Sequence, residues 1–296
     1  MAWRFHFGSA LEAAAAIRAK TISSVELTQH TLRRIDAFQP KLNAYVYELR
    51  DRALLAAKQP DEAIAHNRPT GVFHGVPINV KESFGVKGQP CTWGIAAFRD
   101  SQAPEDAVAV RRLLNSGAIL LGATNVPMAL MDGQAFNDIY GTSNNPWDLA
   151  RTPGGSSGGT SASLAAAMAF LSVGSGIGGS IRTPAAFCGI YGHKPTLDLV
   201  SMAGHFPGGV HGDPGFSSLL AAAGPMARTA EDLDAALRIL AGPEPPESKA
   251  FQWNLPNPRH RQLREYRIGY LLEDPCVPVA EETKTVIVCL ERLTSA

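Results

Sequence analysis

The sequence predicts an α/β fold built around a largely parallel β-sheet, and three observations support this prediction. Short apolar runs, typical of buried strands, occupy residues 75–81, 118–122 and 170–173. Amphipathic or alanine-rich segments, typical of helices, occupy residues 106–115, 160–169 and 229–240. The chain is 45% hydrophobic and only 18% charged, which is ample for a packed core. Strands that alternate with helices are most simply connected as parallel strands joined by crossover helices.

The charge balance excludes several classes of partner. Lysine plus arginine and aspartate plus glutamate both number 27, so the formal net charge is +0. Nucleic acids and anionic membranes select proteins with a basic surface, and this composition supplies none. We therefore expect neither nucleic acid nor a membrane as partner.

The cysteines and the apolar runs indicate the cellular compartment of the protein. The four cysteines have neither metal-site nor disulfide-framework spacing, so we expect buried, reduced thiols: Cys91, Cys188, Cys276 and Cys289. The longest apolar run, residues 164–173, is too short to span a bilayer, and the amino terminus lacks a signal-peptide pattern. These features predict a cytoplasmic protein.

The organisation along the chain is that of one domain, residues 1–296. Helical patterns begin at Ser9 and at the capping box of residues 23–26, and a third, at 48–66, is interrupted by Pro60. We expect a helical cover over residues 1–70 and a catalytic core over 71–242. A proline-rich linker then covers 243–262, and a final part, 263–296, holds a strand at 267–271 and a helix at 279–293.

Two glycine-serine loops, residues 154–159 and 174–180, bracket the apolar segment between them. Glycine lets other groups approach the backbone closely, and a serine at such a turn presents its hydroxyl beside unbonded backbone N–H groups. A nucleophile next to preorganised donors is what acyl transfer requires. The loops therefore indicate a catalytic centre.

Other motifs in these loops lack the structural context that they need. Residues 155–159 match Gly-x-Ser-x-Gly, but the proline-containing segment before them cannot be the strand that a nucleophile elbow requires. Residues 174–179 match the dinucleotide fingerprint Gly-x-Gly-x-x-Gly, with Asp198 at a suitable distance, but prolines and glycines interrupt the helix that should follow. A Ser–His–Asp triad with His205 and Asp213 has no specific support.

Seven segments together resemble the amidase signature family, and they extend over nearly the whole chain. The matching segments are residues 75–81, 124–127, 141–147, 153–159, 178–186, 192–196 and 224–228. The resemblance implies the amidase-signature fold, an α/β architecture in which helices cover both faces of a mixed, largely parallel sheet. It also implies hydrolysis of a small-molecule carboxylic amide through an acyl-serine, without metal or cofactor.

The resemblance assigns a Ser–cis-Ser–Lys triad to three residues. Ser180 is the nucleophile, Ser156 is the bridging serine on a cis peptide after Gly155, and Lys81 is the base. The backbone N–H groups of four successive residues form the oxyanion hole: Ile177, Gly178, Gly179 and Ser180. Three residues are expected near the substrate's acyl group: Leu130, Met131 and Ser156; ordinary core positions are the alternative for Leu130 and Met131.

The chemistry of the three residues agrees with this assignment. Lysine acts as a base only when neutral, and burial lowers its pKa by disfavouring the charged form. The apolar strand before Lys81 provides such burial, while Glu82 should point to the other face. Taken singly, Lys81 is more often a surface charge, Ser156 a turn residue and Ser180 a helix cap. Their joint spacing favours a common site. Four histidines are candidates to line it, although the mechanism needs none: His74, His193, His205 and His211.

The sequence departs from the family at Gly176, where an acidic residue is usual, at His193, where a hydrophobic one is usual, and in its shorter length. Two alternatives remain open. One is the glutaminase subunit of a tRNA-dependent amidotransferase, although Thr183 stands in place of the usual glutamine and the Tyr-Gly-Arg run is absent. The other is a truncated, incompetent or partner-dependent chain, which a second copy or a complementing chain would complete.

Overall fold

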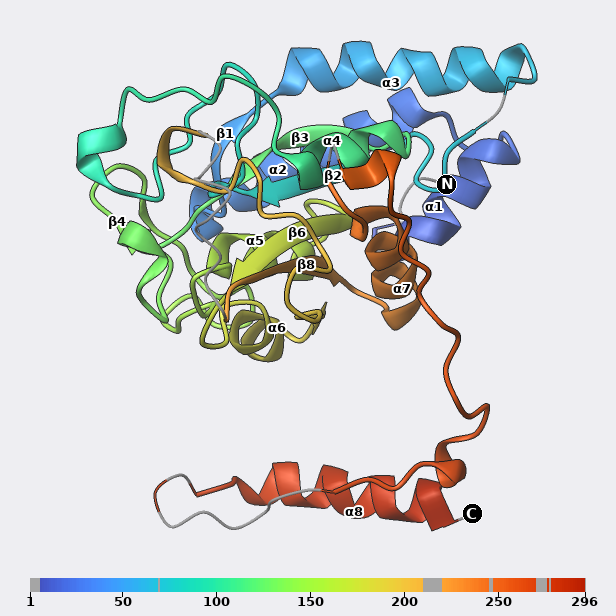
Figure 1. Cartoon of the computed structure of the whole chain (residues 1–296). Coiled ribbons are helices and arrows are strands. Elements are labelled where there is room, and N and C mark those ends of the chain that lie inside the picture. The colour runs from blue at the N-terminus through green and yellow to red at the C-terminus, as the bar shows by residue number, and fades with distance from the viewer. Residues whose placement is uncertain are drawn as a thin grey trace. The chain divides into compact units, whose positions relative to one another are not determined.

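The computed structural model describes residues 6–68, 70–209, 220–244, 247–269, 276 and 278–295. It divides into two compact units, Met1–Trp253 and Asn254–Ala296 (Figure 1). The second unit contains the helix α8 (Glu281–Ser295). The strand expected at residues 267–271 is not formed at 267–269, and the remainder lies outside the described residues.

A six-stranded mixed sheet forms the centre of the first unit, in the order β1-β3-β2-β6-β8-β7. Its strands are β1 (Tyr45–Glu48), β2 (Pro77–Lys81), β3 (Ile119–Thr124), β6 (Leu171–Gly176), β7 (Tyr191–Gly192) and β8 (Ala222–Ala227). The three central strands, β3, β2 and β6, run parallel, while β1, β8 and β7 pair antiparallel with their neighbours. A separate hairpin joins β4 (Phe136–Asn137) and β5 (Gly141–Thr142). The predicted α/β class with a largely parallel core is confirmed.

Helices cover both faces of this sheet (Figure 1). They are α1 (Ala10–Arg18), α2 (Ser24–Leu42), α3 (Arg50–Ala65), α4 (Val108–Asn115), α5 (Gly158–Ala165), α6 (Arg182–Cys188) and α7 (Ala230–Leu240). Alternate side chains of a strand point to opposite faces. Accordingly, Leu120 joins the core of α1, α4 and α7, whereas Ile119 and Leu121 join that of α2, α3 and α5.

The helices α1, α2 and α7 begin where the sequence predicts, but the predicted interruption of α3 at Pro60 is wrong. Ser9 and Ser23 each form a capping box, and Thr229 caps α7. Helix α3, by contrast, continues through Pro60. Proline removes one helical hydrogen bond, yet Ala53, Ala57 and Pro60 are all buried on one side of α3, and this packing outweighs the local cost.

The strand β8 was not predicted from the sequence. It contains Pro225, and its position in the sheet explains how the proline fits. The carbonyl of Pro225 accepts a hydrogen bond from His193 N, on the β7 side. The N–H and C=O of one residue point to the same side of a strand, so the missing donor also faces β7 and not β6. Because β7 is only two residues long, little pairing is lost.

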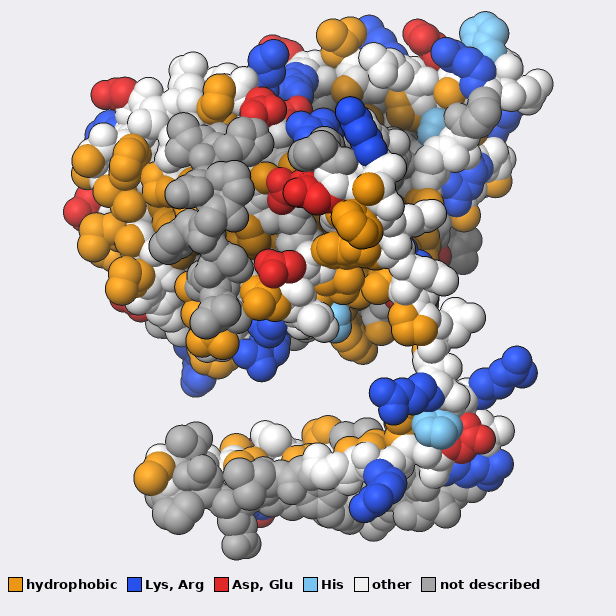
Figure 2. Space-filling model, in the orientation of Figure 1, with side chains coloured by type: hydrophobic (Ala, Val, Ile, Leu, Met, Phe, Trp, Pro, Cys, Tyr) orange, Lys and Arg blue, Asp and Glu red, His pale blue; other side chains and the backbone are white. Residues whose placement is uncertain are grey.

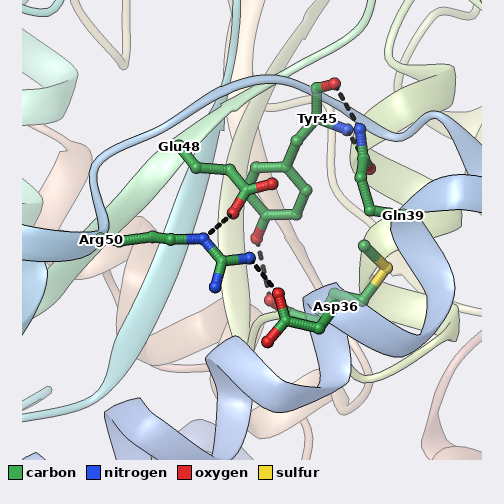
Figure 3. A network of polar contacts seen from close by, with 6 residues as sticks. Asp36, Gln39, Tyr45, Glu48 and Arg50 are labelled. Carbon is green, nitrogen blue, oxygen red and sulfur yellow. Dashed lines mark hydrogen bonds and ion pairs between the residues drawn. The ribbon is translucent and has the colours of Figure 1, made fainter.

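The edge strand β1 was also missed, and polar contacts hold it in place (Figure 3). The Gln39 side chain donates to Tyr45 O at 2.8 Å and accepts from Tyr45 N at 2.9 Å. Arg50 pairs with Glu48 at 2.6 Å and with Asp36 at 2.5 Å. The contacts tie β1 to the end of α2 and the start of α3, its neighbours along the chain.

The expectation for the cysteines holds for two of the four. Cys91 and Cys188 are buried, whereas Cys276 and Cys289 are exposed. The exposed pair lies in the second unit, where the described residues include no fully buried hydrophobic side chain.

Candidate functional site

The alternation of side chains along β2 directs Lys81 toward α5. Ile78 and Val80 belong to the core on the opposite face of the sheet. The side chain of Asn79, two residues before Lys81, donates to Ser163 Oγ of α5 at 2.8 Å. Lys81 is the last residue of β2, beside the carboxyl end of the parallel strand β6. In parallel sheets this edge is where functional residues gather.

The amine of Lys81 is fully buried among three oxygen atoms. Its Nζ lies 2.6 Å from Ser156 Oγ, 3.0 Å from Ser175 Oγ and 3.1 Å from Ser175 O. The peptide bond between Gly155 and Ser156 is cis, so the predicted cis serine is confirmed. The structure therefore brings together Lys81 and Ser156, as the sequence predicts. It also places Ser175 in contact with the lysine, which was not predicted.

Burial perturbs the two adjacent ionisable groups in opposite directions. It lowers the pKa of Lys81 to about 7, and the nearby Glu82 opposes this shift. It raises the pKa of Glu82 to about 7, against hydrogen bonds from Thr92, Trp93 and Tyr140. All of these groups donate to the Glu82 oxygens, so the geometry fits an ionised carboxylate. The hydrogen-bond partners of Glu82 do not include Ser156, which agrees with the prediction that the Glu82 side chain points to the other face.

Ser180 lies on the loop between β6 and α6. Its carbonyl accepts a hydrogen bond from Ser157 N at 3.2 Å, which ties this loop to the segment that carries Ser156. The side chain is partly exposed, and its hydroxyl makes no hydrogen bond with any described residue. The structure thus joins Ser180 to the Lys81–Ser156 pair through the backbone.

The loop before Ser180 offers a row of unbonded amides. Within the described part of the chain, no hydrogen bond is donated by the backbone N–H groups of Ile177, Gly178, Gly179 or Ser180. Gly176 immediately precedes them, and a Cβ at this glycine would lie 3.1 Å from Ser180 N. The departure from the usual acidic residue thus lies directly beside the predicted oxyanion loop.

The loop that carries Leu130 and Met131 passes beside the cis peptide. A Cβ at Gly155 would lie 2.3 Å from Asp132 O, so this loop is in contact with the backbone at Gly155. Leu130 is partly exposed and Met131 is 86% exposed, so neither residue occupies the core. Figure 2 shows hydrophobic side chains on the side of the first unit that carries β4, the hairpin strand that follows this loop.

The histidines suggested by the sequence separate in space. His205 is buried, with Nε2 2.7 Å from Ser175 Oγ. His74 contacts Pro60 O through Nε2 at 3.0 Å, and it precedes the other end of β2. His193 is exposed, while His211 and Asp213 lie outside the described residues. The serine partner of His205 is therefore Ser175 and not Ser180.

The described residues contain no group of three or more histidine, cysteine, aspartate or glutamate side chains arranged to hold a metal ion. Among the described helices, none combines the length and the hydropathy needed to cross a membrane.

Solved structures with a similar fold include two enzymes named for acting on amides. A fatty acid amide hydrolase matches with a TM-score of 0.88 and 28% identity, over 99% of this chain and 52% of that one. A bacterial aryl acylamidase of the amidase signature enzymes matches with a TM-score of 0.74 and 29% identity, over 84% of this chain and 51% of that one.

Curated relatives and a family model agree with this likeness. A glutamyl-tRNA(Gln) amidotransferase subunit from Carboxydothermus hydrogenoformans is 40% identical over 85% of this chain and 50% of its own length. The corresponding protein from Anaeromyxobacter dehalogenans is 43% identical over 79% of this chain and 46% of its own length. The chain thus spans about half the length of these relatives. The family model for amidases matches residues 26–295. This chain belongs to the amidase family, whose members include the amidase signature enzymes.

Proposed function

We propose that the protein hydrolyses a carboxylic amide through an acyl intermediate on Ser180, with Ser156 and Lys81 transferring the proton. The observation that carries this proposal is the 2.6 Å distance between Lys81 Nζ and Ser156 Oγ in a fully buried setting. A serine nucleophile requires a base within hydrogen-bond reach, and a lysine with a pKa near 7 is partly neutral at neutral pH.

In the first step Ser180 Oγ attacks the amide carbon and forms a C–O bond. The Ser180 proton passes to Ser156 Oγ as the Ser156 proton passes to Lys81 Nζ. The C–N bond then breaks, and a proton returns through Ser156 to the leaving nitrogen. Water repeats the sequence on the acyl-serine, releasing the acid and restoring Ser180 and neutral Lys81.

We also propose that the backbone N–H groups at 177–180 form the oxyanion hole, which is supported by their making no hydrogen bond with described residues. They would donate to the carbonyl oxygen as it gains negative charge during the attack. Loss of one such donor typically raises the barrier by about 3 kcal/mol. Because no described group competes for these amides, they are available to a substrate.

The exposed apolar side chains near the cis peptide support an apolar acyl group in the substrate. Met131 is 86% exposed and Leu130 partly so, on the loop in contact with Gly155. We place these two residues, with Ser156, beside the acyl part of the amide. Contact with an apolar substrate would remove this surface from water.

The test is intact mass after reaction with a serine-directed fluorophosphonate. We expect one adduct on the wild type, none on Ser180→Ala, and labelling at least about 100-fold slower on Lys81→Met and Ser156→Ala. Ser116→Ala is the matched control, because this buried serine donates only to Leu113 O at the end of α4. It should label at the wild-type rate. A folded wild-type protein that forms no adduct would refute the proposal and favour a chain that is incompetent alone.

A second candidate is the glutaminase subunit of a tRNA-dependent amidotransferase. It is favoured by the 40% and 43% identity to proteins named as amidotransferase subunits. It is disfavoured by Thr183 and by the absence of Tyr-Gly-Arg after residues 194–196. Release of ammonia from glutamine, with no cleavage of simple aryl or alkyl amides, would select this candidate. The opposite pattern would exclude it.

A further inference from the structure

The contact between His205 and Ser175 extends the polar chain behind Lys81. His205 Nε2 lies 2.7 Å from Ser175 Oγ, and Ser175 Oγ lies 3.0 Å from Lys81 Nζ. All three residues are buried. The imidazole also packs against Phe84 and Trp93, with ring centroids 4.7 Å and 5.1 Å away. His205 is therefore held with one nitrogen directed at Ser175.

The donors and acceptors around a neutral Lys81 can be counted. A neutral amine has two N–H donors and one lone pair. One N–H must go to Ser175 O, since a carbonyl only accepts. One N–H and the lone pair remain for the hydroxyls of Ser156 and Ser175. If Ser175 donates to the lone pair, Lys81 has nothing left with which to accept the Ser156 proton.

We propose that His205 is a positioning residue that accepts a hydrogen bond from the Ser175 hydroxyl at Nε2 and so reserves the Lys81 lone pair for Ser156. Because the Ser175 O–H then donates to His205, Ser175 Oγ accepts the remaining N–H of Lys81. The lone pair then faces Ser156 Oγ, 2.6 Å away, and Lys81 can act as the base. This inference rests on the proposed function, in which Lys81 takes its proton from Ser156.

The environment of His205 keeps the imidazole in the form that this role needs. Burial, together with the positive charge on Lys81, lowers the pKa of His205 to about 3. The ring is therefore neutral wherever Lys81 titrates, and a neutral imidazole has one acceptor nitrogen. For Nε2 to accept the hydrogen bond from Ser175, the single ring proton of neutral His205 must be on Nδ1.

The tautomer can be tested without any activity. Long-range ¹H–¹⁵N correlation on protein labelled with ¹⁵N-histidine distinguishes a protonated from an unprotonated ring nitrogen. The His205 signals are identified by their loss in His205→Gln. We expect Nδ1 to carry the proton and Nε2 to show the shift of an acceptor. A proton on Nε2 would overturn the inference, whether or not the protein is an active amidase.

Fluorophosphonate labelling then tests the role. We expect His205→Leu to label at least about tenfold more slowly, and His205→Gln, whose side-chain oxygen can accept from Ser175, to stay within about threefold of wild type. In a Ser175→Ala background, His205→Leu should cause no further loss, because no competing hydroxyl remains. His74→Leu is the matched control, another buried histidine with one Nε2 contact, and it should not slow labelling.

The outcomes separate this inference from the proposed function. Additive losses from Ser175→Ala and His205→Leu, or equal losses in His205→Leu and His205→Gln, would overturn the role of His205 while labelling of Ser180 persists. Absence of labelling on the folded wild type would refute the proposed function, and the tautomer experiment would still decide on His205.

Discussion

At the scale of the residue, Lys81 combines a fully buried amine with close contacts to Ser156 and Ser175. Burial disfavours the ammonium form and so supplies a base near neutrality, but it also costs stability whenever the amine is charged. Burial of Lys81 therefore favours the reaction, which needs a neutral amine, and destabilises the folded state wherever the amine is charged.

The first prediction concerns the pH dependence of labelling. Lys81, with its pKa lowered to about 7, must be neutral to accept a proton, so the rate should rise with pH and level off above about 7. Below that point it should fall about tenfold per pH unit. The charged or titratable neighbours are Glu82 and His205, and His205 stays neutral in this range.

Glu82→Gln provides the control for this profile. The carboxylate raises the pKa of Lys81, so its removal should move the midpoint to lower pH. A midpoint that moves upward, or a flat profile from pH 5 to 9, would show that Lys81 is not the group being titrated.

The second prediction concerns stability. The pKa of Lys81 falls from 10.5 to about 7 on folding, so the unfolded chain binds more protons between these values. This residue's contribution to the free energy of unfolding should therefore rise from pH 7 to pH 10 and stay at its lowest below 7. Lys81→Met should slow labelling at least about 100-fold, remove this slope and match or exceed wild-type stability at pH 7, by up to about 4 kcal/mol. Urea unfolding at several pH values measures the free energy of unfolding of both proteins. A Lys81→Met variant less stable than wild type at pH 7 would contradict the prediction.

At the scale of the element, the short helix α5 places the segment of Ser156 against the sheet. Its first residues pack so closely that a Cβ at Gly159 would lie 2.4 Å from Asn125 N and 2.6 Å from Ala44 O. Both of these atoms belong to backbone, which a side-chain rotation cannot move aside. The position of α5, and with it that of Ser156, therefore depends on a glycine.

The third prediction is that Gly159→Ala destabilises the protein by about 1–3 kcal/mol or more, because the added methyl forces backbone shifts. Urea unfolding gives the change, and the labelling rate of the remaining folded protein should also fall. Gly133→Ala is the control, since a Cβ there has nothing within 4 Å. Equal stability of the two variants would contradict the close packing.

At the scale of the whole molecule, the core is confined to the first unit. Among the described residues, every buried hydrophobic side chain lies between Ala10 and Leu240. The residues of the proposed site also lie in this range. Burial of apolar surface is the main stabilising term of a fold, so the first unit should not need the second in order to fold.

The fourth prediction follows from this distribution. A chain of residues 1–253 should keep the thermal midpoint of the 296-residue chain to within about 2 °C and keep its fluorophosphonate labelling. Differential scanning calorimetry and intact mass measure the two properties. A shortened chain that aggregates or melts much earlier would show that residues 254–296 support the core.

The sequence by itself determined the α/β class, the central strands β2, β3 and β6, the capped starts of α1, α2 and α7, and the pairing of Lys81 with a cis Ser156. The strands and the helix starts depend on short-range patterns of apolar and capping residues, whereas the pairing of Lys81 with a cis Ser156 was implied by the resemblance to the amidase signature family.

Only the tertiary structure decided the rest. β8 accommodates Pro225 because its missing donor faces a two-residue neighbour, and α3 passes through Pro60 because packing outweighs one hydrogen bond. The contact of His205 with Ser175 joins residues 30 positions apart. Each of these outcomes depends on neighbours that the fold brings together across long stretches of sequence, and local patterns carry no information about such neighbours.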